Sequence, residues 1–174
     1  MSLRACLLAA LVVGGCYTQE GEAPPASAPK SGVPVQFAFG TIDGGEVSSD
    51  STRGRTTALL FVTTYDLPSQ AVALLLRDVL SKHKPLANGA IVMFEPPRSA
   101  PLVQVWRDQM QLELPVAMAS PLLLAGESEL GRVLGVPTLV VLDRRGRIAL
   151  RLEGSFGREQ IESSLSEADA AAPR

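Results

Sequence analysis

Few residues in this 174-residue chain could carry nucleophilic, redox or metal chemistry. Both cysteines, Cys6 and Cys16, lie at the N-terminus, and His83 is the only histidine. Dithiol–disulfide exchange needs two thiols in one folded domain, and zinc or copper sites need clustered cysteine and histidine ligands. The sequence therefore predicts a domain without a redox-active cysteine pair, without a metal site and without another cofactor.

Two carboxylates, Asp66 and Glu95, leave acid–base chemistry open, because each follows an apolar segment. General acid–base catalysis needs such groups within hydrogen-bond reach of a substrate. Composition excludes another class of function: the formal charge is −2, aromatic residues make up 5% of the chain, and the cations are scattered rather than gathered in a run. We therefore expect no nucleic-acid partner.

The N-terminus has the pattern of a secretory signal. Arg4 precedes the apolar segment 5–13, which is too short to span a bilayer, and small residues lead to Cys16. The quartet Val13-Gly14-Gly15-Cys16 resembles a bacterial lipobox, which implies that residues 1–15 form a lipoprotein signal peptide and that Cys16 carries the lipid. The alternative is an ordinary cleavable signal with a chance cysteine.

The lipobox resemblance also implies a location in the bacterial cell envelope, lipid-anchored on the periplasmic side. Tyr17 stands where inner-membrane lipoproteins often have aspartate, which favours the outer membrane. Residues 16–34, rich in Pro, Ala, Ser and Gly, are typical of a flexible tether. We expect a folded domain over residues 35–168 and a disordered tail over 169–174.

The folded domain should alternate strands with helices. A turn at 43–45 predicts an N-terminal β-hairpin, and apolar or alternating runs predict strands at 57–64, 89–94, 115–119, 138–142 and 147–152. Helical spacing of apolar residues predicts one helix through 72–80, another over 127–134 and a last one from Gly157. A further helix should follow an N-cap at Ser99, with Leu102, Val105 and Trp106 facing inward. The fold class is α/β, with a central mixed sheet flanked by helices on both faces and an N-terminal hairpin extension.

Three segments of this domain resemble the thioredoxin-like superfamily, in particular its membrane-tethered TlpA/ResA-like redoxin branch. Residues 58–69 (ALLFVTTYDLPS) are similar to the strand that leads into the family's Cys-x-x-Cys motif, 134–147 (LGVPTLVVLDRRGR) to its Gly-Val-Pro-Thr strand and hairpin, and 154–161 (GSFGREQI) to its last turn and helix. The resemblance implies a thioredoxin-like fold over residues 35–168.

The family's two catalytic positions match Asp66 and Ser69, so both sulfurs are missing and the active site is degenerate. A carboxylate at the start of a helix can accept backbone N–H groups as an N-cap, but it is a poor nucleophile toward disulfides. Asp66 is therefore either a plain helix cap or a carboxylate that binds a partner on the exposed face.

Three further residues belong to the predicted binding groove or stand beside it. The resemblance implies a cis bond before Pro137 and an edge at the backbone of Val136 that can pair with an extended peptide. Glu95 is either an acidic residue beneath the site, as in the family, or a solvated strand end beside two prolines, and the second reading is favoured. His83 lies at a predicted helix end, where a favourable interaction with the helix dipole accounts for a histidine better than a catalytic role does.

Three functions follow from this sequence. The first is a redox-inactive, membrane-anchored protein, not an enzyme, that binds an envelope protein or peptide through Asp66, Val136, Pro137 and Glu95. The second is an oxidoreductase-like enzyme that uses non-cysteine chemistry around Asp66 and Glu95. The third is a structural lipoprotein whose old active site is vestigial.

Overall fold

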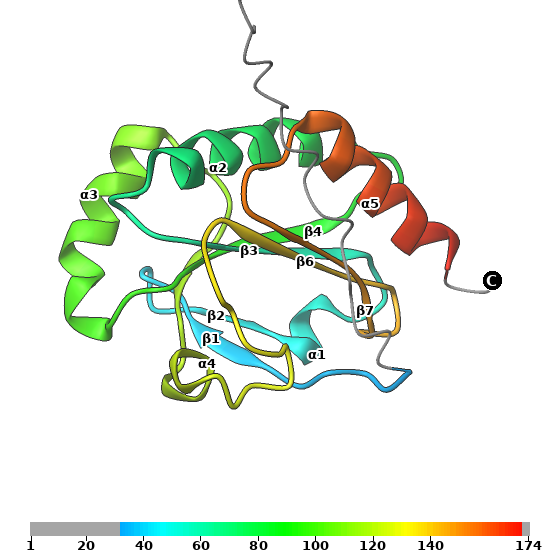
Figure 1. Ribbon diagram of the computed structural model, residues 1–174, viewed down its shortest axis with the longest axis horizontal. Coiled ribbons are helices and arrows are strands. Elements are labelled where there is room, and N and C mark those ends of the chain that lie inside the picture. The colour runs from blue at the N-terminus through cyan, green and yellow to red at the C-terminus, as the bar shows by residue number, and fades with distance from the viewer. Residues whose placement is uncertain (1–31, 172–174) are drawn as a thin grey trace, which may run out of the picture.

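The computed structural model describes residues 32–171 of the chain (Figure 1). Cys6, Cys16, the predicted signal peptide and most of the predicted tether lie outside the described residues. No helix in the described range is long and apolar enough to cross a membrane. In chain order the elements are β1 (Ala38–Gly40), β2 (Glu46–Ser48), α1 (Ser49–Thr52), β3 (Thr57–Val62), α2 (Leu67–Leu80), β4 (Asn88–Met93), η1 (Pro97–Ser99), α3 (Ala100–Met110), β5 (Val116–Met118), α4 (Pro121–Ala125), β6 (Thr138–Leu142), β7 (Ile148–Glu153) and α5 (Arg158–Ala170).

A five-stranded mixed sheet forms the centre of the domain, in the order β5-β4-β3-β6-β7. Strands β3, β4 and β5 are parallel, whereas β6 runs antiparallel to β3 and β7 antiparallel to β6. The carboxyl ends of β3 and β4 therefore meet the start of β6 at one end of the sheet, which we call the site end. The starts of β3 and β4 and the β6–β7 turn meet at the opposite end.

Both faces of the sheet are buried, because β3 and β6 are continuous apolar runs whose side chains alternate between the faces. Ala58, Leu60 and Val62 pack with α2, α3 and α5, while Leu59 and Phe61 pack with the β1–β2 hairpin and α4. Figure 1 shows the three long helices together on one side of the sheet. The predicted mixed α/β fold with an N-terminal hairpin is confirmed, although the second face is covered by the hairpin and short helices.

The predicted helix over 127–134 is wrong. The nearby helix is α4, which Ser120 caps by accepting the Leu123 N–H at 3.2 Å and which ends at Ala125, with Gly126 as its C-cap. Residues 127–136 form irregular structure instead. The buried guanidinium of Arg151 donates to the carbonyl oxygens of Leu130 at 2.9 Å and Arg132 at 2.7 Å, so these two groups have a side-chain partner in place of a helical one.

Helix α3 lies where it was predicted, but its buried face is rotated. Trp106 is 5% exposed, as expected, and Val103 is buried beside it, whereas Leu102 and Val105 are 56% and 52% exposed. Both pairs have the i, i+3 spacing, so periodicity alone could not choose between them. Ser99 does not cap the helix with its side chain, since the 3₁₀ turn η1 leads directly into α3.

The C-terminal helix continues past the predicted domain boundary. Helix α5 ends at Ala170, so residues 169 and 170, which we assigned to the tail, are helical. Asp169 accepts hydrogen bonds from Thr56 Oγ1 and lies 3.0 Å from His83 Nε2. His83 is therefore held by a carboxylate of α5, a contact that the helix-dipole explanation did not foresee.

Candidate functional site

The site end gathers the segments that the sequence singled out. Val62 pairs with Met93 at the end of β3 and β4, and Phe61 pairs with Thr138 at the start of β6. Continuing these registers brings residues 63–66, Glu95 and the segment before Thr138 to one edge of the sheet. Asp66, Glu95 and the Val136–Pro137 bond thus lie at one end of the sheet.

Asp66 is the N-cap of α2, which confirms the capping prediction. Its backbone is extended (φ −103°, ψ 116°), and its Oδ2 accepts the Ser69 N–H at 2.8 Å. Proline in the first turn supports the same helix start. Asp66 therefore satisfies one of the helix's free N–H groups and places a negative charge at the positive end of the helix dipole.

The Ser69 hydroxyl has no base within hydrogen-bond reach among the described residues. The residue is fully buried, and its Oγ has no hydrogen-bond partner among the described residues. A serine nucleophile needs a base within hydrogen-bond reach. The hydroxyls of Thr63 and Thr64 are also buried and unpaired within residues 32–171.

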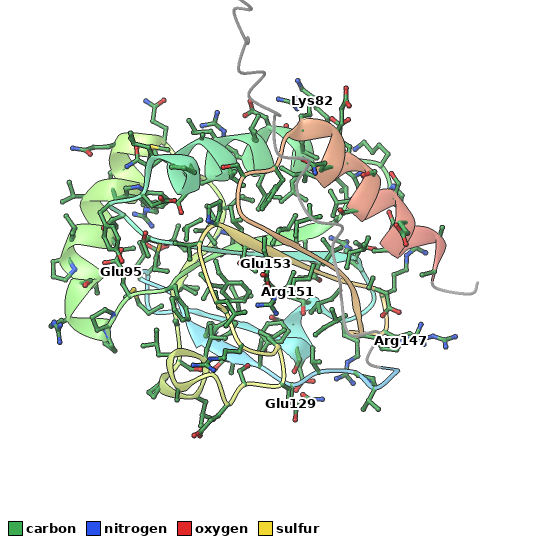
Figure 2. The ribbon with its side chains drawn as sticks, in the orientation of Figure 1. Lys82, Glu95, Glu129, Arg147, Arg151 and Glu153 are labelled. Atoms are coloured by element: carbon green, nitrogen blue, oxygen red, sulfur yellow. The ribbon has the colours of Figure 1, made fainter. Side chains whose placement is uncertain are left out.

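Glu95 is buried, and the favoured reading of a solvated strand end is wrong. The residue is 5% exposed, and its Oε1 accepts the backbone N–H of Thr64 at 2.6 Å (Figure 2). This bond ties the end of β4 to the loop between β3 and α2. The prolines that follow Glu95 misled the prediction, because its partner is 31 residues away in the chain.

The segment before β6 presents free backbone groups. The Val136–Pro137 bond is cis, and the Pro137 carbonyl accepts the Gly154 N–H at 3.0 Å. Among the described residues, the N–H and C=O of Val136 form no hydrogen bond. Large apolar side chains at this end are open to solvent: Tyr65 is 79% exposed, and Leu67 and Leu134 are each 75% exposed.

Arg151 positions this segment, and the sequence reasoning missed it. The side chain extends from β7, is 7% exposed, and also donates to Glu153 Oε1 at 2.8 Å (Figure 2). Its bonds to the 127–136 segment hold the chain that leads to Val136. An arginine in an otherwise alternating apolar strand was the available signal, but its carbonyl partners lie about 20 residues away.

No group of three or more histidine, cysteine, aspartate or glutamate residues in the described part of the chain could hold a metal ion. A cleft of about 700 Å³ lies between α2 and α3, but none of the predicted site residues lines it. Its arginines, Arg77 and Arg107, are paired with Asp78 and Asp108. The site end is thus a surface of backbone edge, carboxylate and apolar groups.

The fold matches solved thioredoxin-like structures. A thiol:disulfide interchange protein of the thioredoxin family from Chlorobium tepidum matches with a TM-score of 0.64 and 23% identity, over 82% of this chain and 99% of that one. A DsbF homologue from Corynebacterium diphtheriae matches with a TM-score of 0.70 and 14% identity, over 86% and 96%.

StoA from Bacillus subtilis matches with a TM-score of 0.61 and 22% identity, over 76% of this chain and 97% of StoA. No family model matches the sequence, and no match to a curated protein was found. At these identities the similarity defines the fold. The chain has a thioredoxin-like fold, with a carboxylate at Asp66 and a hydroxyl at Ser69, the two positions matched in sequence to the cysteines of the thioredoxin-like family.

Proposed function

We propose that the chain is a redox-inactive thioredoxin-like protein that binds an extended polypeptide in the bacterial cell envelope. One observation carries this proposal: the free N–H and C=O of Val136 at an exposed end of the sheet. An extended peptide can pair with such an edge by main-chain hydrogen bonds, while its side chains contact the surface around it. The exposed Tyr65, Leu67 and Leu134 supply apolar contacts there.

The location and the anchor are part of the same proposal. Residues 1–15 would act as the signal and Cys16 as the point of lipid attachment, on the periplasmic side and in the outer membrane. The solved structures with this fold include one described as a secreted disulfide oxidoreductase, which supports a site of action outside the cytoplasm. A partner would be an envelope protein or peptide whose segment is extended when bound.

Acid–base catalysis has weaker support. Asp66 and Glu95 each accept a backbone N–H, from Ser69 and Thr64, and these bonds hold the carboxylates in structural roles. No base contacts the Ser69 hydroxyl among the described residues. A purely structural lipoprotein with a vestigial site is the remaining alternative, and it predicts no binding at Val136.

Peptide binding can be tested with matched exposed leucines. Leu134→Arg places a long cation beside the Val136 edge, while Leu86→Arg changes an exposed leucine (53% exposed) at the start of β4, at the opposite end. The probe is reduced, carboxymethylated lactalbumin, which is an extended chain. We expect the wild type and Leu86→Arg to bind it equally and Leu134→Arg to bind at least tenfold more weakly. Equal binding by all three, or none by the wild type, would support a vestigial site.

Redox inactivity needs a separate assay with a positive control. The wild type should reduce insulin disulfides no faster than buffer with dithiothreitol. Asp66→Cys/Ser69→Cys restores two thiols at a helix N-terminus, where a thiolate is stabilised, and it should accelerate the reaction. Turnover by the wild type would overturn the proposed inactivity, whereas the double variant shows that the assay can detect this fold.

A further inference from the structure

Five arginines lie on two turns that are joined at the end of the sheet opposite the site. Arg53 and Arg55 precede β3, and Arg144, Arg145 and Arg147 belong to the β6–β7 turn. The Gly54 N–H donates to the Arg144 carbonyl at 3.0 Å, which fixes the two turns side by side. The register of Thr57 with Leu142 places both at this end. We call these five residues the basic end.

Carboxylates offset only part of this charge. Arg53 pairs with Asp50 at 3.4 Å, Arg144 with Asp169 at 3.5 Å, and Arg147 with Asp143 at 2.6 Å. Arg55 and Arg145 are exposed and form no ion pair with any residue that the structure describes.

Two more cations follow α2 near this end of the sheet, although Lys82 lies on the helix side of the molecule, away from Arg147 (Figure 2). Lys82 and Lys84 are exposed and flank His83, whose ring contacts Asp169. Glu167 is one further acid, and it lines a cleft of about 210 Å³ with Arg147. The exposed cations at this end therefore outnumber the acids beside them, although the whole chain has a formal charge of −2.

The first described residues of the chain, 32–35, also lie at the basic end. The Val35 N–H donates to the Gly146 carbonyl at 2.9 Å, and Gly32 lines the same 210 Å³ cleft as Arg147. Residues 32–35 therefore lie beside these arginines. The site end lies about 20 Å away, since β3 has six residues at about 3.3 Å each. Figure 2 shows Glu95 and Arg147 at opposite sides of the molecule.

We propose that the basic end binds the anionic headgroups of a phospholipid surface, so that the domain presents its site end away from the membrane. Guanidinium groups pair with phosphate through two parallel hydrogen bonds, and cations near an anionic bilayer gain attraction within a Debye length. The entry of the chain at this end favours a membrane over a free anionic partner. This inference concerns orientation; it rests on the proposed membrane anchor at the N-terminal segment, but not on peptide binding at Val136.

The test compares two double variants of the full chain that have the same net charge. Arg55→Gln/Arg145→Gln removes the two unpaired arginines of the basic end. Arg98→Gln/Arg132→Gln removes two exposed arginines elsewhere, on η1 and the 127–136 segment. Co-sedimentation measures binding to phosphatidylcholine vesicles with and without phosphatidylglycerol. The ratio of the two affinities cancels the contribution of the apolar N-terminal segment.

We expect the wild type and the control pair to prefer anionic vesicles equally. The basic-end pair should lose about 30-fold of that preference, because each arginine near an anionic surface contributes about 1 kcal/mol. High salt should abolish the wild-type preference. Equal losses in both pairs, no preference in the wild type, or displacement by inorganic phosphate at constant ionic strength would each overturn the proposal. Matched urea midpoints would show that the variants remain folded.

Discussion

Substitutions at Asp66 can separate the energy of the cap from that of the charge. Asp66→Ala removes the acceptor of the Ser69 N–H, and because Ser69 is fully buried this N–H cannot turn to water. The free energy of unfolding should therefore fall by about 2 kcal/mol, in the upper part of the range for N-caps, and by about 0.5 kcal/mol more for the lost charge at the helix N-terminus. Asp66→Asn keeps an acceptor and loses the charge, so it should cost about 0.5 kcal/mol.

Urea unfolding followed by far-UV circular dichroism measures both effects. With a denaturant slope of about 2 kcal/mol per molar, Asp66→Ala should lower the midpoint by roughly 1 M and Asp66→Asn by about a quarter of that. Asp50→Ala is the matched control, since its side chain is 86% exposed and its ion pair with Arg53 is a surface pair of little energy. If Asp66→Asn costs as much as Asp66→Ala, or neither costs more than the control, the capping argument is wrong.

Three other substitutions test buried or half-buried polar groups by the same unfolding measurement. Ser69→Ala removes a buried hydroxyl with no described partner, so stability should stay unchanged or rise by up to about 1 kcal/mol; a large loss would reveal a hidden partner. Burial alone would raise the pKa of Asp169, but hydrogen bonds from Thr56 and His83 outweigh it and hold this pKa below 3.8. Because the folded pKa is depressed, the Asp169 carboxylate stabilises the fold at pH values above its unfolded pKa, and this contribution disappears as the pH falls through the folded pKa. Asp169→Asn should therefore lose less stability than the wild type when the pH drops below about 4. Identical curves of stability against pH for the two proteins would contradict this. Arg151→Met leaves two loop carbonyls without their charged donor and should lower the free energy of unfolding by about 3 kcal/mol. Backbone hydrogen exchange over 127–136 should also become faster. An unchanged exchange rate would show that Arg151 does not position this segment.

Local signals in the sequence predicted much of this fold. The continuous apolar runs of β3 and β6 identified buried strands, and the helical spacing from Val72 to Leu80 identified α2. The cap at Asp66 was also predictable, since its partner is the third residue along the chain. These features depend on neighbours in sequence, which is why a single sequence contains them.

The errors arise where a distant residue supplies the partner. Glu95 was read as solvated because its own surroundings are polar and proline-rich, yet the backbone of Thr64 binds it. The segment 127–134 has helical spacing, but two of its carbonyl oxygens accept hydrogen bonds from Arg151 of β7. In α3 two apolar stripes compete, and only the packing of Trp106 against the sheet decides which is buried. Periodicity cannot encode these long-range choices.

The burial of Trp106 gives this domain a built-in optical reporter. Trp106 is the only tryptophan of the chain, lies on the buried face of α3 with 5% exposure, and its indole N–H has no partner among the described residues. An indole in such dry, apolar surroundings emits at short wavelength, and water shifts that emission to the red. Its spectrum therefore follows the docking of α3 alone, and a red shift that precedes the loss of circular dichroism would show α3 leaving the sheet before the domain unfolds.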